Sequence, residues 1–517
     1  MQCALAVTSA LNCSQIRNAF TGRGLGAPEP TGEEATGTFL QVCGAQESCC
    51  SPAMEDELVQ RSSRDLEKIM EDATEELRDT FTSHQKRFED LLQSLLDVSE
   101  RSLNEMFLRT YGKPYVQNAD LFQRLFLDLR GHLKGVDSNL EDILHEFWTR
   151  LLERMFTLLN SEIQITDEYL ECLGKHMEML QPFGDVPKKL QMQVMRAFLG
   201  ARSFVQGLAV ARDVSDKVSK VSMSSVCVHG FTKMLYCSYC TGIFSLKPCE
   251  SICLTVMKSC LADFGLLDKE WTRFTDAMLL VTERLQGPFN IESVMEPIDV
   301  KISEAIMNLQ ENSMHISYQV FQGCGQPKSS GSPRSVRGTP DLFSGGRFRP
   351  YEELPTSPAP HPLQSLVEEV REKLQRFRGF FESMSLRFCQ EEIETSASDQ
   401  NVLESQEDKH QKVNSDSTRS NAVIGQQILI LRVMSNRLKN AYQGNDVDFL
   451  DNNEGGSASG SGSGCMEACD TDTHSSITET PALGSNTVSS SASASHNHMM
   501  HALTLLMMMV MWVHHWR

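Results

Sequence analysis

The chain has 517 residues, a formal net charge of −20 at pH 7 and 40% hydrophobic residues. This length and composition allow one large or two modest domains with an ordinary buried core. The strong negative charge argues against nucleic acid as a partner, because a polyphosphate would be repelled, but it leaves basic extracellular ligands open. A soluble acidic surface accounts for the charge equally well.

Cysteine is the most informative residue type in the chain. Of the 16 cysteines, thirteen fall between Cys13 and Cys389, and several stand close together, as Cys49 and Cys50 do. Such clusters indicate metal ligands in a reducing compartment and disulfides in an oxidising one. The choice between these interpretations depends on the compartment, which the terminal segments of the chain indicate.

Residues 1–12 are interpreted as the remnant of a secretory signal segment. Cys3 to Leu11 is a short, mildly apolar run, and no basic residue precedes it. A complete signal has a stronger apolar centre and usually a positively charged start. A cytosolic protein would fit this end of the chain equally well.

Residues 13–324 are predicted to form a cysteine-rich helical core. Ser51 followed by Pro52 predicts the start of a helix. Apolar residues then recur in steps of three and four: Leu66, Met70, Ala73, Leu77, Phe81, Phe88, Leu92, Leu95 and Met106. A periodic stretch well over about 25 residues long predicts an elongated all-α bundle rather than a compact globule.

Shorter apolar stripes continue the helical pattern. Ser138 to Glu141 predicts a capping box at the start of another helix. The three stripes are Leu140, Ile143, Leu144, Phe147, Leu151, Met155 and Leu158; Leu190, Val194, Ala197, Ala201, Phe204 and Leu208; and Ile298, Ile302, Ala305, Ile306 and Leu309. We assign all of them to the core and none of them to chemistry.

Residues 325–362 are predicted to be an exposed linker, because Gly325 to Pro362 holds eight of the 18 prolines. Within it, Arg334 and Arg337 form a minimal proprotein-convertase pattern and are a candidate cleavage site, although such four-residue patterns are also common by chance. Residues 363–443 are predicted to return to the core as two helices, Leu363 to Phe388 and Ala422 to Tyr442, around a polar, disordered insert at 390–420.

Residues 444–491 are predicted to form a disordered Ser/Gly stalk that bears glycosaminoglycan. Ser459, Ser461 and Ser463 each precede a glycine, just after the acidic residues of 446–454. A glycosaminoglycan starts with xylose on a serine hydroxyl, and glycine keeps the backbone open for the transferase. A plain Gly/Ser linker explains the composition but not the strict Ser-Gly alternation beside acidic residues.

Residues 492–517 are predicted to be a GPI-addition signal that is removed, with the anchor attached at Ser491. Ser489 to Ser495 are all small, a polar spacer follows, and Ala502 to Val513 is an apolar run of 12 residues. A membrane-spanning helix needs about 20 apolar residues, so this run is too short to span. Small residues, spacer and apolar tail together favour a lipid anchor over a short hydrophobic tail of no consequence.

A second motif combines Cys237, Cys240, Cys249, Cys253 and Cys260. Two closely spaced cysteine pairs could bind zinc. The second pair has three intervening residues, and no outlying histidine completes a standard zinc pattern. In an anchored extracellular protein disulfides are therefore favoured, and no metal ion or other cofactor is expected.

The cysteine motif resembles the signature of the glypican family. That signature is Cys-x-x-Cys-x-Gly-aliphatic, four residues, Pro-Cys, three residues, Cys, six residues and Cys, and the chain keeps it from Cys237 to Cys260. It departs at Ile252, where the family usually has an aromatic residue, and at Ser259, where it has glycine. Further similar stretches are Cys49-Cys50, Arg109 to Asn118, Leu151 to Phe156 and Gly287 to Met314.

The resemblance implies six disulfides by position: Cys13 with Cys49, Cys43 with Cys237, Cys50 with Cys240, Cys172 with Cys324, Cys227 with Cys260, and Cys253 with Cys389. The family pairs the cysteine at Cys249 with one that follows Cys389. No cysteine lies between Cys389 and Cys465, and 390–420 does not resemble the family's segment. We therefore expect Cys249 to be unpaired and the C-terminal lobe to be looser than the rest.

The resemblance implies a non-enzymatic, GPI-anchored heparan sulfate proteoglycan core on the outer leaflet of the plasma membrane or released from it. Its covalent heparan sulfate would bind and present growth factors and morphogens of the fibroblast growth factor, Wnt, Hedgehog and bone morphogenetic protein classes. A glycan-independent protein-binding co-receptor is the alternative. An enzyme is disfavoured, because the sequence has no HExxH, GxSxG or P-loop motif and we assign no catalytic residue.

Overall fold

The computed structural model describes residues 13–25, 40–44, 48–136, 138–242, 248–326, 362–394 and 422–444. Within them the chain is helical and has no β-strand. The helices are α1 Cys13–Gly22, α2 Pro52–Tyr111, α3 Lys113–Val116, α4 Ala119–Leu133, α5 Leu140–Leu159, α6 Asp167–Lys175, α7 Met177–Leu180, α8 Val186–Ser219, α9 Ser225–Leu235, the 3₁₀ helix η2 Cys237–Thr241, α10 Glu250–Cys260, α11 Ala262–Leu285, α12 Ile291–Met295, α13 Ile298–Glu311, α14 Ser313–Cys324, α15 Pro362–Arg376, α16 Phe380–Glu394 and α17 Ala422–Gln443.

The chain divides into two units, Met1–Asp451 and Asn452–Arg517, and all described residues belong to the first. That first unit is an elongated helical bundle joined by several disulfides, so the predicted fold class is confirmed. None of the helices in the described ranges is long and apolar enough to cross a membrane.

Helix α2 starts where the sequence predicts. The Ser51 hydroxyl accepts a hydrogen bond from the amide of Met54 at 3.3 Å, and Pro52 is the first helical residue. Its 60 residues span about 90 Å at roughly 1.5 Å per residue. Leu66, Leu77, Phe88 and Ser99 are buried at intervals of 11 residues, which is close to three turns of a straight helix. The buried face therefore stays on one side of α2 along its whole length.

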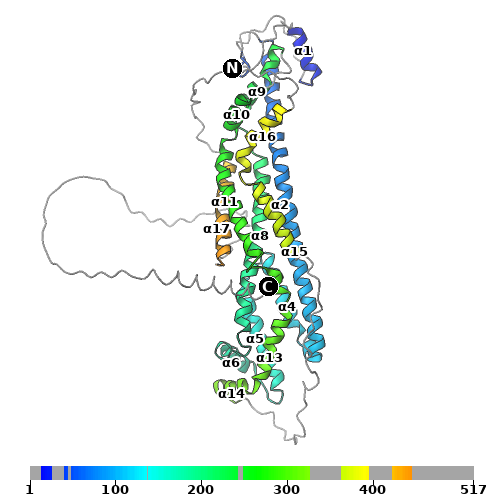
Figure 1. The fold of residues 1–517 in the computed structure, drawn as a ribbon, viewed down its shortest axis with the longest axis vertical. Helices are drawn as coiled ribbons and strands as arrows, with labels where there is room; N and C mark the ends of the chain where they lie inside the picture. The colour runs from blue at the N-terminus through cyan, green and yellow to red at the C-terminus, as the bar shows by residue number, and fades with distance from the viewer. Residues whose placement is uncertain are drawn as a thin grey trace, which may run out of the picture. The chain divides into compact units, whose positions relative to one another are not determined.

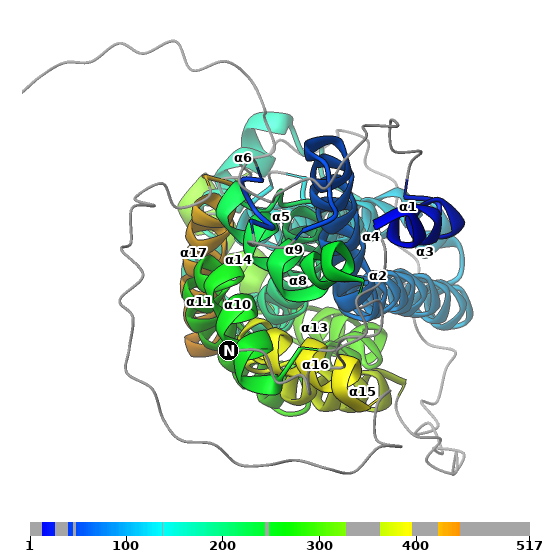
Figure 2. The same ribbon diagram turned by 90° about the horizontal axis from the view of Figure 1, so that it is seen from above.

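Helix α8 lies at the centre of the bundle (Figure 2). It packs against α2, α5, α11, α13 and α17, and every residue from Ala197 to Phe204 is buried. All six residues of the predicted stripe in this segment, from Leu190 to Leu208, are buried as expected. A helix buried nearly all round is the natural centre of such a bundle.

The remaining helices follow α2 from end to end (Figure 1). Helix α1, η2 and the start of α2 form one end, and α6 and α14 lie at the other. Between them, α15 and α16 pack against α2, α10 and α11. The main core is rich in aromatic rings: the fully buried Trp271 contacts Phe81 and Phe381, and its indole N–H donates to the carbonyl of Phe377 at 2.9 Å.

Helix α17 lies along α11, and its last turn is held by a contact between Arg284 and Tyr442. The guanidinium of Arg284 lies over the ring of Tyr442 at 4.3 Å and donates to the Tyr442 carbonyl at 3.1 Å. Gly444 follows with φ 79°, a left-handed conformation that glycine adopts without strain. This contact holds the last turn of α17 against the end of α11.

Three local predictions are wrong. The capping box at Ser138 is replaced by Asn139, whose side chain accepts from the amide of Glu141 at 2.9 Å, because asparagine caps a helix as well as serine does. The single helix from Leu363 to Phe388 is broken into α15 and α16 at Gly379, which has φ 69°. Residues 390–394, assigned to a disordered insert, continue α16; the rest of that insert lies outside the described residues.

Glycine at position 207 permits the close approach of α8 and α11. A β-carbon there would lie 2.2 Å from the sulfur of the fully buried Met278. We expect Gly207→Ala to lower the free energy of unfolding by about 1–3 kcal/mol, since the packed methionine has little room to move. Denaturant unfolding followed by circular dichroism measures the change.

Gly265→Ala is the matched control. Gly265 is also helical, but its added β-carbon would meet nothing within 4 Å. This substitution should raise stability by roughly 0.5–1 kcal/mol through helix propensity alone. Equal effects of the two substitutions would contradict the packing argument.

Candidate functional site

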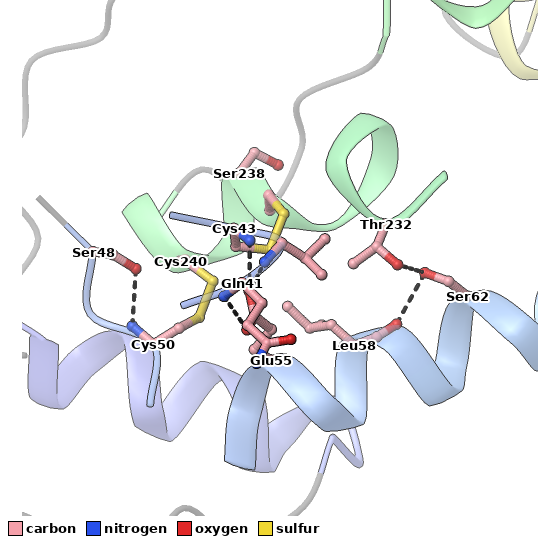
Figure 3. Close-up of a disulfide and its surroundings, with 12 residues drawn as sticks. Gln41, Cys43, Ser48, Cys50, Glu55, Leu58, Ser62, Thr232, Ser238 and Cys240 are labelled. Atoms are coloured by element: carbon pink, nitrogen blue, oxygen red, sulfur yellow. Dashed lines mark hydrogen bonds between the residues drawn. A yellow bond between two sulfur atoms is a disulfide. The ribbon is translucent and has the colours of Figure 1, made fainter. Parts of the chain in front are cut away.

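The cysteine motif lies at the end of the bundle formed by α1, η2 and the start of α2. Three disulfides join these elements: Cys13–Cys49, Cys43–Cys237 and Cys50–Cys240, with Cα–Cα distances of 5.2, 5.1 and 5.0 Å. The amide of Cys49 also donates to the carbonyl of Cys240 at 2.9 Å. The described residues before α2 are therefore tied to η2 at Cys43, Cys49 and Cys50; Figure 3 shows the Cys50–Cys240 bond.

Glu55, in the first turn of α2, holds this segment through its backbone. Its carboxylate accepts hydrogen bonds from the amides of Gln41, Val42 and Cys43 at 2.8, 2.7 and 2.6 Å (Figure 3). The side chain is buried, so these three bonds compensate the cost of removing its charge from water. Glu55 was not predicted from the sequence, although the apolar period of α2 extends back through Leu58 to Met54.

A small separate core supports the same end of the molecule. Its buried members are Ile16, Phe20, Leu25, Val42, Cys43, Cys50, Met54, Leu58 and Cys240. Nearby, the phenol of Tyr236 donates a hydrogen bond to Asp65 of α2. Burial, together with this hydrogen bond and the negative charge of Asp65, raises the pKa of Tyr236, so the phenol stays a neutral donor.

The other disulfides join helices along the bundle. Cys227–Cys260 links α9 to α10, Cys253–Cys389 links α10 to α16, and Cys172–Cys324 links α6 to α14. Together with the three at the cysteine-rich end, these are the six pairs that the resemblance implies. Each of these cysteine sulfurs is bonded to another sulfur and is therefore not available as a thiolate ligand for zinc.

The prediction that Cys249 is unpaired is wrong, since Cys249 is disulfide-bonded. The other described cysteines pair among themselves, so the partner of Cys249 lies outside the described residues. The expectation rested on the absence of a cysteine between Cys389 and Cys465, but Cys3, Cys465 and Cys469 also lie outside the described residues. The expectation of a looser C-terminal lobe was based on an unpaired Cys249, and it therefore has no remaining support.

One cluster contains residue types that often bind metal ions, but its two cysteines are not free thiolates. The sulfurs of Cys172 and Cys324 and a ring nitrogen of His176 lie within 4.8 Å of one another. Both cysteines are consumed in their mutual disulfide, and His176 Nδ1 bonds to the Cys172 carbonyl at 2.8 Å. The group therefore has a structural role.

The chemistry-bearing residues predicted from the sequence lie outside the described residues. These are the attachment serines Ser459, Ser461 and Ser463, the anchor residue Ser491, and the convertase residues Arg334 and Arg337. The structure thus brings together the predicted cysteines but does not place the glycan, anchor or cleavage positions. What the described part offers is a rigid, covalently joined helical core.

Comparison with known proteins defines the family. The sequence model of the glypican family matches residues 2–516. Glypican-1 of Gallus gallus is 36% identical over 477 residues, covering 89% of this chain and 86% of that protein. The crystal structure of C-terminally truncated glypican-1 has a TM-score of 0.72 and 34% identity, covering 85% of this chain and 100% of that chain.

A second similar structure is that of Dally-like protein in complex with O-palmitoleoyl serine. It has a TM-score of 0.63 and 31% identity, and it covers 84% of this chain and 99% of that chain. The described fold and its disulfides are thus those of a cell-surface proteoglycan core, a class without enzymatic activity. The chain belongs to the glypican family. The resemblance of its cysteine motif to the family is thereby confirmed, and the similar proteins include glypican-1.

We expect Glu55→Ala to loosen the cysteine-rich end, because the substitution leaves three backbone amides without an acceptor. Each unpartnered buried amide costs about 1–3 kcal/mol. Hydrogen exchange at residues 41–43 should accelerate by at least about tenfold, since roughly 1.4 kcal/mol changes an opening equilibrium by that factor.

Asp56→Asn is the control for this experiment, because Asp56 is the exposed neighbour of Glu55 on α2. It should leave the exchange of residues 41–43 unchanged. Protection that survives in Glu55→Ala would show that the disulfides alone hold the segment.

Proposed function

We propose that this protein is a GPI-anchored heparan sulfate proteoglycan core that acts as a co-receptor, binding growth factors and morphogens and presenting them at the cell surface. The observation that carries the proposal is the family match over residues 2–516, which includes the Ser-Gly repeat. The helical core then serves as a rigid support, and the chemistry of recognition belongs to the attached polysaccharide.

The glycan would be attached at Ser459, Ser461 and Ser463. Each serine is followed by glycine, and acidic residues stand close before them. Several sulfated chains on neighbouring serines would raise the local concentration of a bound ligand. The proposed ligands are basic proteins of the fibroblast growth factor, Wnt, Hedgehog and bone morphogenetic protein classes, whose Lys and Arg clusters bind a polyanion in a salt-dependent way.

Replacing Ser459, Ser461 and Ser463 together with alanine should remove the heparan sulfate. On a non-reducing gel, the native protein should run as a high-molecular-weight smear that heparinase collapses, and the triple variant should run as a discrete band below the 58.0 kDa of the whole chain, because residues 492–517 are removed. The matched control is Ser457→Ala, because Ser457 lies in the same segment but precedes alanine.

A heparinase-sensitive smear that persists in the triple variant would place the glycan elsewhere. A protein without any smear would favour the alternative, a glycan-independent co-receptor. One observation supports that alternative: a cavity of about 340 Å³ lies between α2, α10 and α16, and its lining combines apolar residues such as Met70, Met257 and Phe388 with the charged Asp72, Glu76 and Arg387. By analogy with the Dally-like complex, it would take an acyl group.

The membrane attachment would be a lipid at Ser491, with residues 492–517 removed. Ser491-Ala492-Ser493 supplies three small residues ahead of a polar spacer and the apolar run to Val513. We further propose that a convertase cleaves after Arg337. The two resulting chains would remain joined, because Cys253–Cys389 connects the parts on either side of the cut.

Phosphatidylinositol-specific phospholipase C should release the protein from the surface of living cells. The reason is that the enzyme cuts the lipid anchor and would have no effect on a spanning helix. Surface staining and the amount of protein in the medium measure the release, with a known anchored protein as the positive control. Full retention of this protein beside a released control would refute the anchor.

A further inference from the structure

The disulfide Cys172–Cys324 joins α6 to the last residue of α14, at the end of the bundle away from the cysteine-rich end. Both of its cysteines are partly exposed. By contrast, Cys253 and Cys389, which form the bridge between α10 and α16, are 0% exposed. A thiol in solution has to reach a sulfur before it can exchange with it, so Cys172–Cys324 is among the bridges open to that reaction.

A histidine lies against both sulfurs of this bridge. Nδ1 of His176 is 3.7 Å from the sulfur of Cys172 and 3.8 Å from the sulfur of Cys324. The three residues are the one such group in the described ranges, so no other described disulfide has a histidine or carboxylate within 4.8 Å of both sulfurs. This is the position of a group that can give a proton to a leaving sulfur.

The contacts of the His176 ring assign its protons. Nδ1 lies 2.8 Å from the carbonyl oxygen of Cys172, which can only accept, so Nδ1 carries a hydrogen. Nε2 has no hydrogen-bond partner among the described residues and is not sealed from water. A β-carbon at Gly323 would lie 3.0 Å from Nε2, so glycine leaves that side of the ring open. Nε2 can therefore take a second proton from water, and the resulting imidazolium has the Nδ1 proton to give.

The neighbouring polar side chains of α6 are engaged elsewhere. Glu171 and Lys175 are exposed and pair with each other at 2.7 Å. The hydroxyl of Tyr169 donates to the carbonyl of Gly325 at 3.2 Å. His176 is therefore the side chain of this helix that is placed to assist a reaction at the bridge.

In its bonded state the bridge cross-links two helices that bury few side chains. Helix α14 buries Ile316 and Val320, and α6 buries Leu173. So little apolar surface contributes only a small part of what holds the end of α14 in place. Opening the S–S bond would therefore release the last turn of α14, which makes the bridge a latch.

We propose that Cys172–Cys324 is a reactive disulfide that exchanges with a small thiol in the extracellular medium, with His176 as its proton donor. The incoming thiolate bonds to the sulfur of Cys324, which lies between the exposed Gly323 and Gly325. The S–S bond breaks, and its electron pair goes to the sulfur of Cys172.

The Nδ1 proton of the His176 imidazolium moves to the sulfur of Cys172, and a neutral imidazole with its hydrogen on Nε2 remains. A second thiolate then attacks the mixed disulfide on Cys324. The reductant leaves as its own disulfide, and the sulfur of Cys324 takes a proton from water. Both cysteines end as thiols, and the latch is open.

Reduced glutathione and the intact protein purified from expressing cells test this proposal. Existing thiols are blocked with N-ethylmaleimide, glutathione is added, and new thiols are trapped with iodoacetamide at successive times and located by peptide mapping. Cys13–Cys49 is the internal control, because it is the other described bridge whose two cysteines are both partly exposed. Cys172 and Cys324 should be labelled at least about tenfold faster than Cys13 and Cys49, and the glutathione adduct should appear on Cys324.

His176→Asn separates the chemistry from the structure. The asparagine amide can still donate to the Cys172 carbonyl in place of Nδ1, but it cannot give up a proton. Labelling of Cys172 and Cys324 should slow by roughly tenfold or more, while Cys13 and Cys49 keep their rate. A histidine with a structural role alone would leave the rate unchanged or, by loosening the latch, increase it.

Either of those two results would overturn the proposal. Labelling of Cys172 and Cys324 in the native protein that is no faster than labelling of Cys13 and Cys49 would also overturn it. These readouts are independent of heparan sulfate and of the lipid anchor.

Discussion

The fold depends on one constraint, which is that the 60-residue helix α2 must bury a stripe along its entire length. An isolated helix has little stability from its own hydrogen bonds and needs tertiary packing. Because the buried positions recur every 11 residues, the stripe never winds away from its partners, and α4, α8, α9, α13 and α15 can all pack against α2. The central helix α8 then collects the second layer, α11 and α17.

The cysteine-rich end of the bundle has only a small hydrophobic core and is stabilised in a different way. Its core has nine buried residues, far fewer than the main core, and so it gains less from the hydrophobic effect. Three disulfides, together with the three hydrogen bonds from backbone amides to the Glu55 carboxylate, provide stability there that the small core alone does not. Cross-links restrict the unfolded chain and stabilise a small core at little cost in volume. The two ends of α2 are therefore stabilised by different physics.

The sequence was informative wherever a feature is periodic or local. The stripes of α2, α8 and α13 and the start at Ser51 could be predicted, because side-chain spacing and capping express themselves over a few residues. The break at Gly379 could not, since glycine within a helical pattern is tolerated or breaking according to tertiary context. Glu55 and His176 were missed for a related reason: the partner of a polar side chain is a property of three-dimensional packing.

The joint at Arg284 gives the core a mechanical property. Helix α17 lies along α11 and α8, and the guanidinium holds its last turn through the ring and carbonyl of Tyr442. Tension transmitted through the residues after Gly444 enters the core at this point. A pull along the axis of α17 is opposed by its whole buried face at once, from Ile424 to Ala441, in shear. A pull across that axis would instead peel the helix from Gly444 inward, with the Arg284 contact as the first to yield.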